Sequence, residues 1–387
     1  MEWKEVRLGD VCEIYGRIGF RGYTTNDLVD TPKEGAISLS PKNIINGELN
    51  LEQCTYIKWD KYYESPEIMI NPNEIVITKT GSSVGRTTFV RRVVHPMTLN
   101  PQLVVLKNIS ENAEFLSYYI KSALFQSVLK SIVVGSAIPT LSQKNLANLM
   151  INVPKEVEDQ RRIASILSSL DRKIELNNKI NADLEEMAQA IFKNWFVDFE
   201  PFKDGKFVDS ELGMIPEGWK VGCLGDLITI KYGKDHKKLD DGTFPVYGSG
   251  GFMRFVNSWL YNGESVLIPR KGTLNNIMYV CEKFWTVDTM FFSVPKMDYV
   301  MKYVYNYIKR FDFSKMNEGT SVPSNTAARL NKMPILIPTH EILEMYDETL
   351  CPIYNKRKMK DKESRTLSLL RDTLLPRLMS GELEVPE

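Results

Sequence analysis

The sequence predicts an α+β fold, with two pseudo-symmetric mixed α/β domains separated by two long helices that form an antiparallel coiled coil. Three observations predict this class. Short landmarks occur twice along the chain in the same order. Short β-like runs alternate with turn residues between these landmarks, as they do in sheet-containing domains. Two long segments carry the apolar spacing of coiled-coil helices.

The duplication organises the chain, because a sequence that repeats indicates a structural unit that repeats. The first landmark, Trp-Lys followed by Leu-Gly-Asp, recurs 216 residues later, whereas the later landmarks recur after 184 residues. The first domain therefore carries 32 additional residues between its landmarks. The repeated stretches are 3–10 and 219–226, 135–139 and 319–323, and 149–154 and 333–338.

Between the landmarks, apolar and β-branched runs are bounded by turn residues, which is typical of strands. A few longer stretches have helical character. Each half of the chain is therefore expected to be a mixed α/β domain. The clearest expected strands are 74–78, 102–106, 265–268 and 290–294, and the expected helices are 114–131 and 297–310.

The segment 158–196 contains neither Gly nor Pro, and its apolar residues alternate in steps of four and three, the seam of a coiled coil. A second helix repeats this seam at an offset of 183 residues. The residues expected to pair the helices are Ile163, Leu167, Leu170, Ile174, Leu184 and Ile191 in the first helix and Tyr346, Leu350, Ile353, Leu367 and Leu374 in the second.

The second seam departs from the first at three points. Arg357 and Lys360 stand where the first seam has Ile174 and Asn177, and polar seam residues restrict register and partner choice. Pro352 should kink the second helix or delay its start. Two separate amphipathic helices, each packed on its own domain, remain the alternative to a helix pair.

These features predict four segments: a first domain over 1–157, a central helix over 158–199, a second domain over 200–340 and a C-terminal helix over 341–387. A helix of roughly 38 residues spans about 57 Å at 1.5 Å per residue. That length is an upper bound on the separation of the domains and corresponds to about 17 base pairs of DNA. The helices would act as a ruler between the domains.

The charge of the chain is balanced, with 49 basic and 49 acidic residues. The first domain holds 17 basic and 16 acidic side chains and the second holds 18 and 15, so the acidic excess lies on the helices. Five scattered cysteines, three distant histidines, and the lack of a signal peptide or membrane span predict a cytoplasmic protein without a metal site.

Three stretches resemble landmarks of the specificity subunits of type I restriction–modification systems: 190–199 (AIFKNWFVDF), 212–219 (LGMIPEGW) and 374–383 (LLPRLMSGEL). Together with the order of domains and helices, the resemblance covers essentially the whole chain. It implies a non-catalytic subunit that binds double-stranded DNA and two methyltransferase subunits and directs adenine methylation at a bipartite sequence. Restriction subunits, which are motor–nucleases, would then join the complex. The helices would separate the half-sites and dock the methyltransferase subunits.

No catalytic chemistry is recognisable in the sequence. The (N/D)PP(Y/F) motif of adenine methyltransferases is absent, and the stretch 81–86 is too short for a phosphate-binding loop. We therefore expect no catalytic residue and no cofactor. A cryptic enzyme has no positive feature in its favour. A coiled-coil scaffold whose domains bind protein stays open as an alternative, because the neutral charge does not require DNA.

DNA reading needs hydrogen-bonding side chains on projecting loops, with Arg or Lys suited to guanine and Asn or Gln suited to adenine. Ordinary solvated turns are the alternative for every such loop, and Arg17 with Arg21 form a further candidate pair. Tyr62, Tyr63 and Trp259 are interpreted as packing residues. The candidates are Lys42, Asn43, Lys79, Thr80, Ser82, Ser83, Arg86 and Ser136 in the first domain, and Lys234, Lys237, Lys238, Ser249, Arg270, Lys271, Thr273, Asn275, Asn276 and Ser321 in the second.

Overall fold

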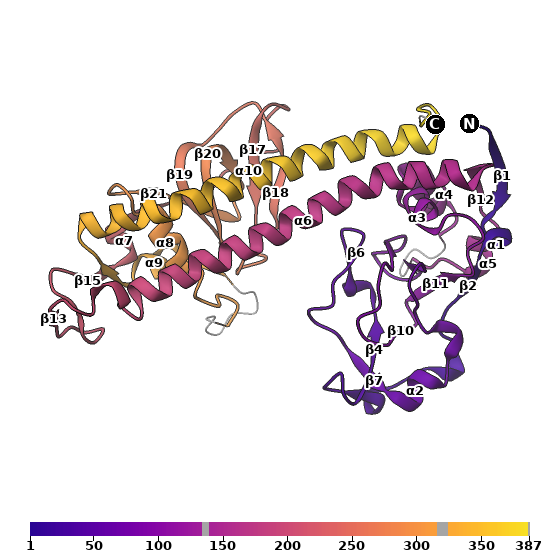
Figure 1. Ribbon diagram of the computed structural model, residues 1–387, viewed down its shortest axis with the longest axis horizontal. Helices are drawn as coiled ribbons and strands as arrows, with labels where there is room; N and C mark the ends of the chain where they lie inside the picture. Colours follow the sequence, from indigo (N-terminus) through magenta and orange to yellow (C-terminus); the bar gives the residue numbers. More distant parts are fainter. Residues whose placement is uncertain (134–138, 316–323, 386–387) are drawn as a thin grey trace. The chain divides into compact units, whose positions relative to one another are not determined.

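The computed structural model describes residues 1–133, 139–315 and 324–385 (Figure 1). The chain divides into two compact units, Met1–Leu176 with Glu363–Glu387, and Asn177–Lys362. Each unit contains one α/β domain together with parts of two long helices, α6 (Val157–Phe196) and α10 (His340–Met379). Among the described residues, no helix combines the length and apolar character needed to cross a lipid bilayer.

The first domain is built from two four-stranded sheets. One sheet has the order β2-β11-β8-β9 and is antiparallel throughout, and the other has the order β10-β4-β7-β3 with β10 and β4 parallel. Two further pairs are β1–β12 and β5–β6. The strands are β1 (Trp3–Arg7), β2 (Glu13–Tyr15), β3 (Leu28–Val29), β4 (Gly35–Leu39), β5 (Ile44–Ile45), β6 (Glu48–Leu49), β7 (Tyr56–Lys58), β8 (Ile75–Thr78), β9 (Thr87–Phe89), β10 (Met97–Leu99), β11 (Leu103–Lys107) and β12 (Met150–Pro154).

The helical stretch expected at 114–131 is two helices, because the chain turns at Ser122. The backbone of Ser122 is extended, and its hydroxyl accepts a hydrogen bond from the Phe125 amide as the N-cap of the second helix. One apolar face of the first of these helices, with Phe115 and Ile120, is fully buried in the core. The helices of the first domain are α1 (Leu8–Val11), α2 (Trp59–Tyr63), α3 (Ala113–Lys121), α4 (Ala123–Ser131) and α5 (Gln143–Ala147).

The second domain is built on a six-stranded sheet with the order β16-β21-β19-β20-β17-β18 and two strand pairs, β13–β14 and β15–β22. The helix expected at 297–310 begins later, at Met301, because Tyr299 has a left-handed backbone (φ 62°). The elements are β13 (Phe207–Val208), β14 (Ile215–Pro216), β15 (Lys220–Cys223), α7 (Leu224–Leu227), β16 (Ile228–Tyr232), β17 (Phe244–Gly248), β18 (Gly251–Val256), β19 (Tyr261–Pro269), β20 (Met278–Thr286), β21 (Met290–Pro295), α8 (Met301–Ile308), α9 (Ala327–Asn331) and β22 (Pro334–Ile337).

The sequence repeat is a structural repeat. The order β2-β11-β8-β9 in the first domain matches β16-β21-β19-β20 in the second, and the pair β1–β12 matches β15–β22. The same backbone hydrogen bond closes the strand pair in each domain, from Leu8 to Leu149 (2.9 Å) and from Leu224 to Met333 (2.9 Å). The landmarks that recur in the sequence therefore build this shared strand pair.

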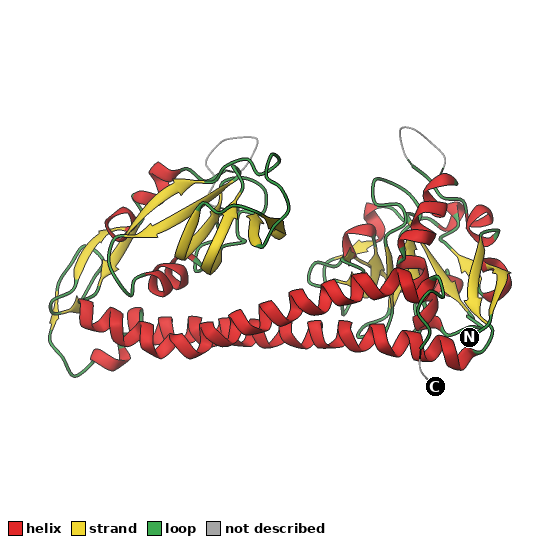
Figure 2. Cartoon of the chain, turned by 90° about the horizontal axis from the view of Figure 1, so that it is seen from above, coloured by secondary structure: helices red, strands yellow, loops and turns green. Residues whose placement is uncertain are grey.

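The two long helices pair in antiparallel fashion within each unit (Figure 2). Both are 40 residues long, and both of their ends differ by the 183-residue offset of the seam. In the first unit, Asp171 of α6 accepts a charged hydrogen bond from Arg371 of α10 (2.8 Å). In the second unit, Asn181 of α6 donates to Asp361 of α10 (2.7 Å). This pairing, with the two mixed domains, confirms the predicted fold class.

The seam residues differ in burial according to what covers them. Five seam residues are buried members of a domain core, whereas Leu184, Ile191 and Leu374 pack against a core and are only partly covered. The helices thus pack both on each other and on the domains, so the two arrangements considered from the sequence coexist. Ile163, Leu167, Tyr346, Leu350 and Ile353 are buried, whereas Leu170, Ile174, Leu184, Ile191, Leu367 and Leu374 are half-buried.

Pro352 does not delay the start of the second helix, which begins at His340 and continues through Pro352. A proline inside a helix removes one backbone hydrogen bond and costs about 3 kcal/mol. The neighbouring Leu350, Ile353 and Tyr354 are buried in the core of the second domain. Burial of these three side chains offsets the cost, so tertiary packing overrides the local preference of the proline.

The repeated tryptophan of each domain holds the C-terminal end of a long helix. In the second unit, the ring of Trp219 lies 5.6 Å from Phe196 at the end of α6 and 5.7 Å from Phe199. In the first unit, Gly381, just after the end of α10, packs against Trp3. A Cβ added to Gly381 would lie 2.7 Å from the indole nitrogen of Trp3. The conspicuous aromatic and glycine residues of these landmarks are therefore anchors between helix and domain.

Candidate nucleic-acid interface

Loops of the first domain converge at the edge where β4, β8 and β10 end. Three backbone hydrogen bonds join them: Asn100 N to Leu39 O (2.8 Å), Lys79 N to Gln102 O (2.8 Å) and Leu141 N to Lys79 O (2.8 Å). β4 and β10 are parallel, so their carboxyl ends lie side by side. We call residues 40–42, 79–86, 100–102 and 139–141 the first-domain cluster.

The first-domain cluster presents both cationic and small polar side chains. Lys42, Ser82 and Arg86 are exposed, whereas Lys79, Thr80 and Ser83 are half-buried. Burial lowers the pKa of the Lys79 ammonium group. The loop 79–86 is shaped by two glycines with left-handed backbones, Gly81 (φ 102°) and Gly85 (φ 90°). The side-chain amide of Gln126 in α4 fixes this loop by donating to the Gly85 carbonyl (3.0 Å).

Two of the first-domain candidates are structural residues instead. Asn43 is 2% exposed, and its amide donates to the carbonyls of Asn50 (3.1 Å) and Gln53 (3.4 Å), so it shapes its own loop and cannot reach DNA. Arg17 is 5% exposed and donates to the Leu99 carbonyl (2.9 Å). Ser136 and Ser321 lie outside the described residues.

Loops of the second domain converge in the same way. The three backbone hydrogen bonds recur as Val287 N to Tyr247 O (3.1 Å), Arg270 N to Thr289 O (2.8 Å) and Asn325 N to Arg270 O (3.0 Å). Arg270 is therefore the structural equivalent of Lys79, because the backbone amide and the carbonyl of each residue form corresponding hydrogen bonds. We call residues 248–250, 270–276, 287–289 and 325 the second-domain cluster.

Arg270 is held in place from two sides. Its guanidinium group lies 4.8 Å from the centre of the Tyr232 ring, within cation–π range, and donates to the Asp288 carbonyl (2.8 Å). Arg270 is half-buried, so the residue keeps part of its surface accessible. A pre-positioned guanidinium is suited to bidentate contact with phosphate or guanine.

The other candidates of the second-domain cluster lie around Arg270. Lys271, Thr273 and Asn275 are exposed, and Asn276 and Ser249 are half-buried. The Asn276 amide donates to the Ser249 carbonyl (2.9 Å), which ties the loop 270–276 to the turn between β17 and β18. Asn275 donates to the Asp312 carboxylate (2.7 Å), so part of its hydrogen-bonding capacity is used within the domain.

A lysine-rich loop lies beside the second-domain cluster. The Lys234 amide donates to the Thr286 carbonyl (2.9 Å), one residue before the cluster begins at Val287. Lys234, Lys237 and Lys238 are all exposed. The loop is fixed by Arg254 of β18, which donates to the carbonyls of His236 (2.8 Å) and Leu239 (2.7 Å). These three lysines therefore form an ordered cationic rim beside the cluster.

The two domains share the scaffold of the cluster but differ in the segment that leads into it. Forty residues separate Leu39 from Lys79 in the first domain, whereas 23 separate the equivalent Tyr247 and Arg270. This interval accounts for 17 of the 32 additional residues and contains β5, β6, β7 and α2. Equivalent loops are thus embedded in different surroundings in the two domains.

The turn at Asn100–Gln102 is a part of the first-domain cluster that the sequence analysis missed. The stretch 102–106 reads as a strand, but β11 begins at Leu103 and leaves Gln102 in the turn, where it is exposed. The dipeptide Asn-Pro at 100–101 is a turn signal that could have found it. Tyr232 and Asp288 were missed in the second domain, because only the fold brings them to Arg270.

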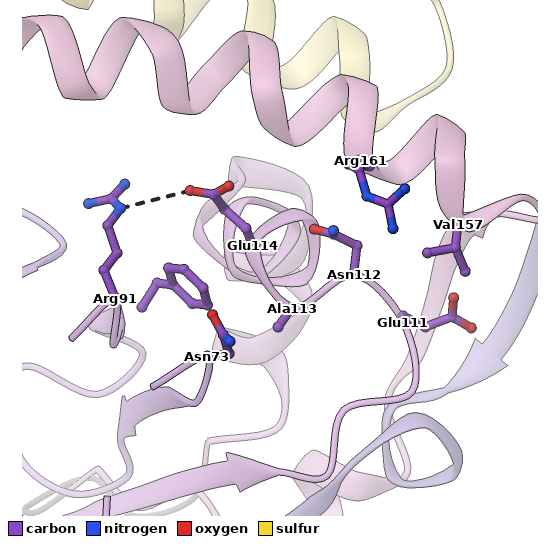
Figure 3. Close-up of a pocket in the computed structure, with 9 residues that line it drawn as sticks. Asn73, Arg91, Glu111, Asn112, Ala113, Glu114, Val157 and Arg161 are labelled. Carbon is purple, nitrogen blue, oxygen red and sulfur yellow. Dashed lines mark ion pairs between the residues drawn. The ribbon is translucent and has the colours of Figure 1, made fainter. Parts of the chain in front are cut away.

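A separate hollow of about 500 Å³ lies at the opposite end of the β8–β9 hairpin from the loop 79–86 (Figure 3). Its charged side chains are engaged with one another or with neighbouring elements. Arg91 lies 3.8 Å from Glu114 and 3.2 Å from Glu48, and Glu111 lies 2.8 Å from Lys4. This hollow contains no residue of the first-domain cluster, and we assign its charges to the stability of the domain.

Gly272 provides a test of how closely the loop 270–276 must approach the turn that contains Ser249. Its backbone is left-handed (φ 84°), and an added Cβ would lie 2.5 Å from the Ser249 hydroxyl. We expect Gly272→Ala to lower the free energy of unfolding of the full chain by more than about 1–2 kcal/mol, the cost of a left-handed backbone alone, measured by denaturant titration. Gly251→Ala is the matched control, because its backbone is also left-handed (φ 112°) and nothing lies within 4 Å of its added Cβ. Equal effects of the two substitutions would contradict the close approach.

The two equivalent domains, each with an equivalent loop cluster, define a protein with a duplicated domain on paired helices, and the comparisons with known proteins place the chain in a family. Residues 1–186 and 216–360 match the family described as the type I restriction modification DNA specificity domain. The chain belongs to this family, the specificity subunits of type I restriction–modification systems, as its sequence landmarks predicted.

The chain aligns with relatives over nearly their whole length. The chain is 26% identical to the type I restriction enzyme MjaIX specificity subunit of Methanocaldococcus jannaschii, covering 100% of this chain and 94% of the relative. It is 22% identical to the HindI specificity subunit of Haemophilus influenzae, covering 99% and 100%. The crystal structure of an S subunit from M. genitalium has the same fold, with a TM-score of 0.58 at 18% identity over 97% of this chain and 96% of that one.

Proposed function

We propose that this protein is the sequence-specific DNA-binding subunit of a cytoplasmic type I restriction–modification complex. It recognises a bipartite target in double-stranded DNA, one half-site with each loop cluster, and is itself not a catalyst. Two methyltransferase subunits bound to it methylate adenine in the target. Restriction subunits that join the complex cleave DNA that lacks this methylation.

The observation that carries the proposal is the equivalence of the two clusters. Lys79 and Arg270 occupy corresponding points of the same hydrogen-bonded scaffold, and each is surrounded by exposed hydroxyl, amide or cationic side chains. Phosphate contacts by cations and amides fix the position of a protein on DNA, and side chains at base edges read sequence. One scaffold with two different sets of side chains suits the reading of two different half-sites.

The balanced charge of the chain is compatible with this role because the cations are placed locally. The second-domain cluster and its rim bring together Lys234, Lys237, Lys238, Arg270 and Lys271. Partner subunits supply further phosphate contacts in the proposed complex. Binding should therefore depend on salt concentration through a limited number of phosphate contacts of this chain.

We assign a spacer role to the two 40-residue helices, which each contribute to both units. A paired helix bends less than a flexible linker, so it is suited to keep a constant gap between half-sites. The helices also carry exposed apolar side chains, including Leu176, Leu369 and Leu370, that a methyltransferase subunit would cover.

The test is to express the chain with its methyltransferase subunits and map methylated adenines by single-molecule sequencing. We expect one split motif, with two half-sites and a constant gap. Filter binding of the purified complex to that target and to a scrambled duplex would show a preference for the target. Methylation without a split motif, or equal binding of both duplexes, would instead favour a protein-binding scaffold.

A further inference from the structure

The turn that follows β10 adds an exposed amide side chain to the first-domain cluster. Gln102 is exposed at the tip of this turn, while its carbonyl accepts the Lys79 amide (2.8 Å). The backbone of Gln102 is thus fixed to the loop 79–86, while the residue itself stays exposed. The Gln102 side-chain nitrogen lies 3.9 Å from the point where a Gly81 Cβ would stand, so the amide lies over this loop.

Asn100 orients the amide of Gln102. The Asn100 side-chain oxygen accepts the Gln102 backbone amide (2.9 Å), which closes the turn, and its side-chain nitrogen donates to the Gln102 side-chain oxygen (3.2 Å). The second hydrogen bond restricts the rotation of the Gln102 amide and defines which end is the donor. A pre-oriented amide loses less conformational entropy when it binds a base.

A carboxamide of this kind matches one base edge. In the major groove, adenine presents the N7 acceptor beside the N6 amino donor, and a Gln or Asn amide can bind both at once. The neighbouring Lys79 and Arg86 are cations, which suit phosphate or guanine rather than adenine. We propose that Gln102, positioned by Asn100, reads an adenine in the half-site bound by the first domain; this inference rests on the proposed function.

The second domain provides an internal comparison. Its equivalent turn, 287–289, has the sequence Val-Asp-Thr and contains no amide side chain. Asp288 is exposed there, and its carbonyl is occupied by the guanidinium group of Arg270 (2.8 Å). The two half-sites are therefore read by different groups at this point, and a change of Gln102 must alter only the half-site of the first domain.

The test uses the complete chain in complex with its methyltransferase subunits and maps the methylated motif for each variant. For Gln102→Ala, we expect one adenine position of one half-site to become degenerate, with discrimination against other bases falling about tenfold or more. For Gln102→Glu, we expect that position to favour cytosine, because a carboxylate accepts from the cytosine N4 amino group. The other half-site and the gap should stay as in the wild type.

Asn100→Asp separates positioning from turn formation. The aspartate keeps the oxygen that accepts the Gln102 backbone amide but loses the donor to the Gln102 side chain. We expect the same position to lose discrimination partially, while overall methylation is retained. Asn26→Ala is the control, because Asn26 is exposed in η2 (Thr25–Asp27), at the edge of the sheet opposite to β10. The complex that carries this substitution should methylate the same motif as the wild type.

The outcomes separate this inference from the proposed function. If the wild-type complex yields no split motif, the proposed function fails and the inference fails with it. If the wild-type motif is split and Gln102→Ala leaves both half-sites unchanged, the inference alone is overturned. If Gln102→Ala abolishes methylation, Gln102→Glu, which keeps the shape of the side chain, decides: a switch to cytosine supports the inference, and an unchanged motif overturns it.

Discussion

Replacing both Arg270 and Lys271 with alanine is expected to weaken binding of the assembled complex to its target about a hundredfold or more. Each well-placed cation contact to DNA contributes about 1–3 kcal/mol. Arg270 contributes a guanidinium group that Tyr232 and the Asp288 carbonyl already hold in position, so little entropy is lost when it binds. Binding would be measured by titration of a target duplex at physiological salt, with mapping to show that only one half-site is affected.

The matched control removes two lysines from another part of the same domain. Lys220 and Lys332 are exposed, lie in β15 and at the end of α9, and belong to neither the second-domain cluster nor its rim. Their replacement with alanine changes the net charge by the same amount, so a general loss of electrostatic attraction would weaken binding equally. An equal effect of both double substitutions would contradict the assignment of Arg270 and Lys271 as local contacts.

The equivalent double substitution in the first domain, Lys79 and Arg86 to alanine, is expected to affect the other half-site. Where the lost contacts are to phosphates, the slope of log affinity against log salt should become smaller by about one for each contact. Where they are to bases, the preference among sequences should change instead. Sequence-specific binding that survives both this substitution and that of Arg270 with Lys271 would rule out the clusters as the DNA-binding surface.

The parts of the structure that local sequence patterns determine were predictable. The seam of Ile163 and Leu167 repeats at Tyr346 and Leu350, and a helical period predicts a buried face wherever a partner exists. The glycine-containing loops after β8 and β19 were also recognisable. A strand followed by Gly, Ser or Thr and a basic residue predicts a turn that carries hydrogen-bonding side chains. The confirmed family rests on such local landmarks in their order.

The composition of each cluster was not predictable, because long-range contacts decide it. Asn43 has the side chain of an adenine-reading residue. Its amide, however, donates to the carbonyls of Asn50 and Gln53, and the residue is buried, so it cannot contact a base. Gln102 was expected in a strand, and it joins the cluster through the hydrogen bond that its carbonyl accepts from the Lys79 amide. A local pattern gives the type of a side chain, whereas the partners that occupy or release it come from segments far away in the sequence.

Phe196→Ala is expected to lower the free energy of unfolding of the second unit by about 3–5 kcal/mol, the largest effect on stability among the predictions. Phe196 is 5% exposed, and its ring lies 4.6 Å from Tyr303, 4.7 Å from Tyr346 and 5.6 Å from Trp219. Alanine would leave a cavity among three rings, two on α8 and α10 and one directly before β15, so the helix end would lose one ring contact with each of these elements.

Trp219 also supplies the measurement, because its fluorescence should follow the unfolding of this cluster during a denaturant titration of the full chain. Phe196→Leu fills part of the cavity and should cost less than the alanine substitution. Met187→Ala on the same helix removes a side chain that is 52% exposed and should change the free energy by no more than about 0.5 kcal/mol. If Phe196→Ala costs no more than Met187→Ala, then α6 does not owe its attachment to the second domain to this cluster, and the proposed spacer would lack a rigid end.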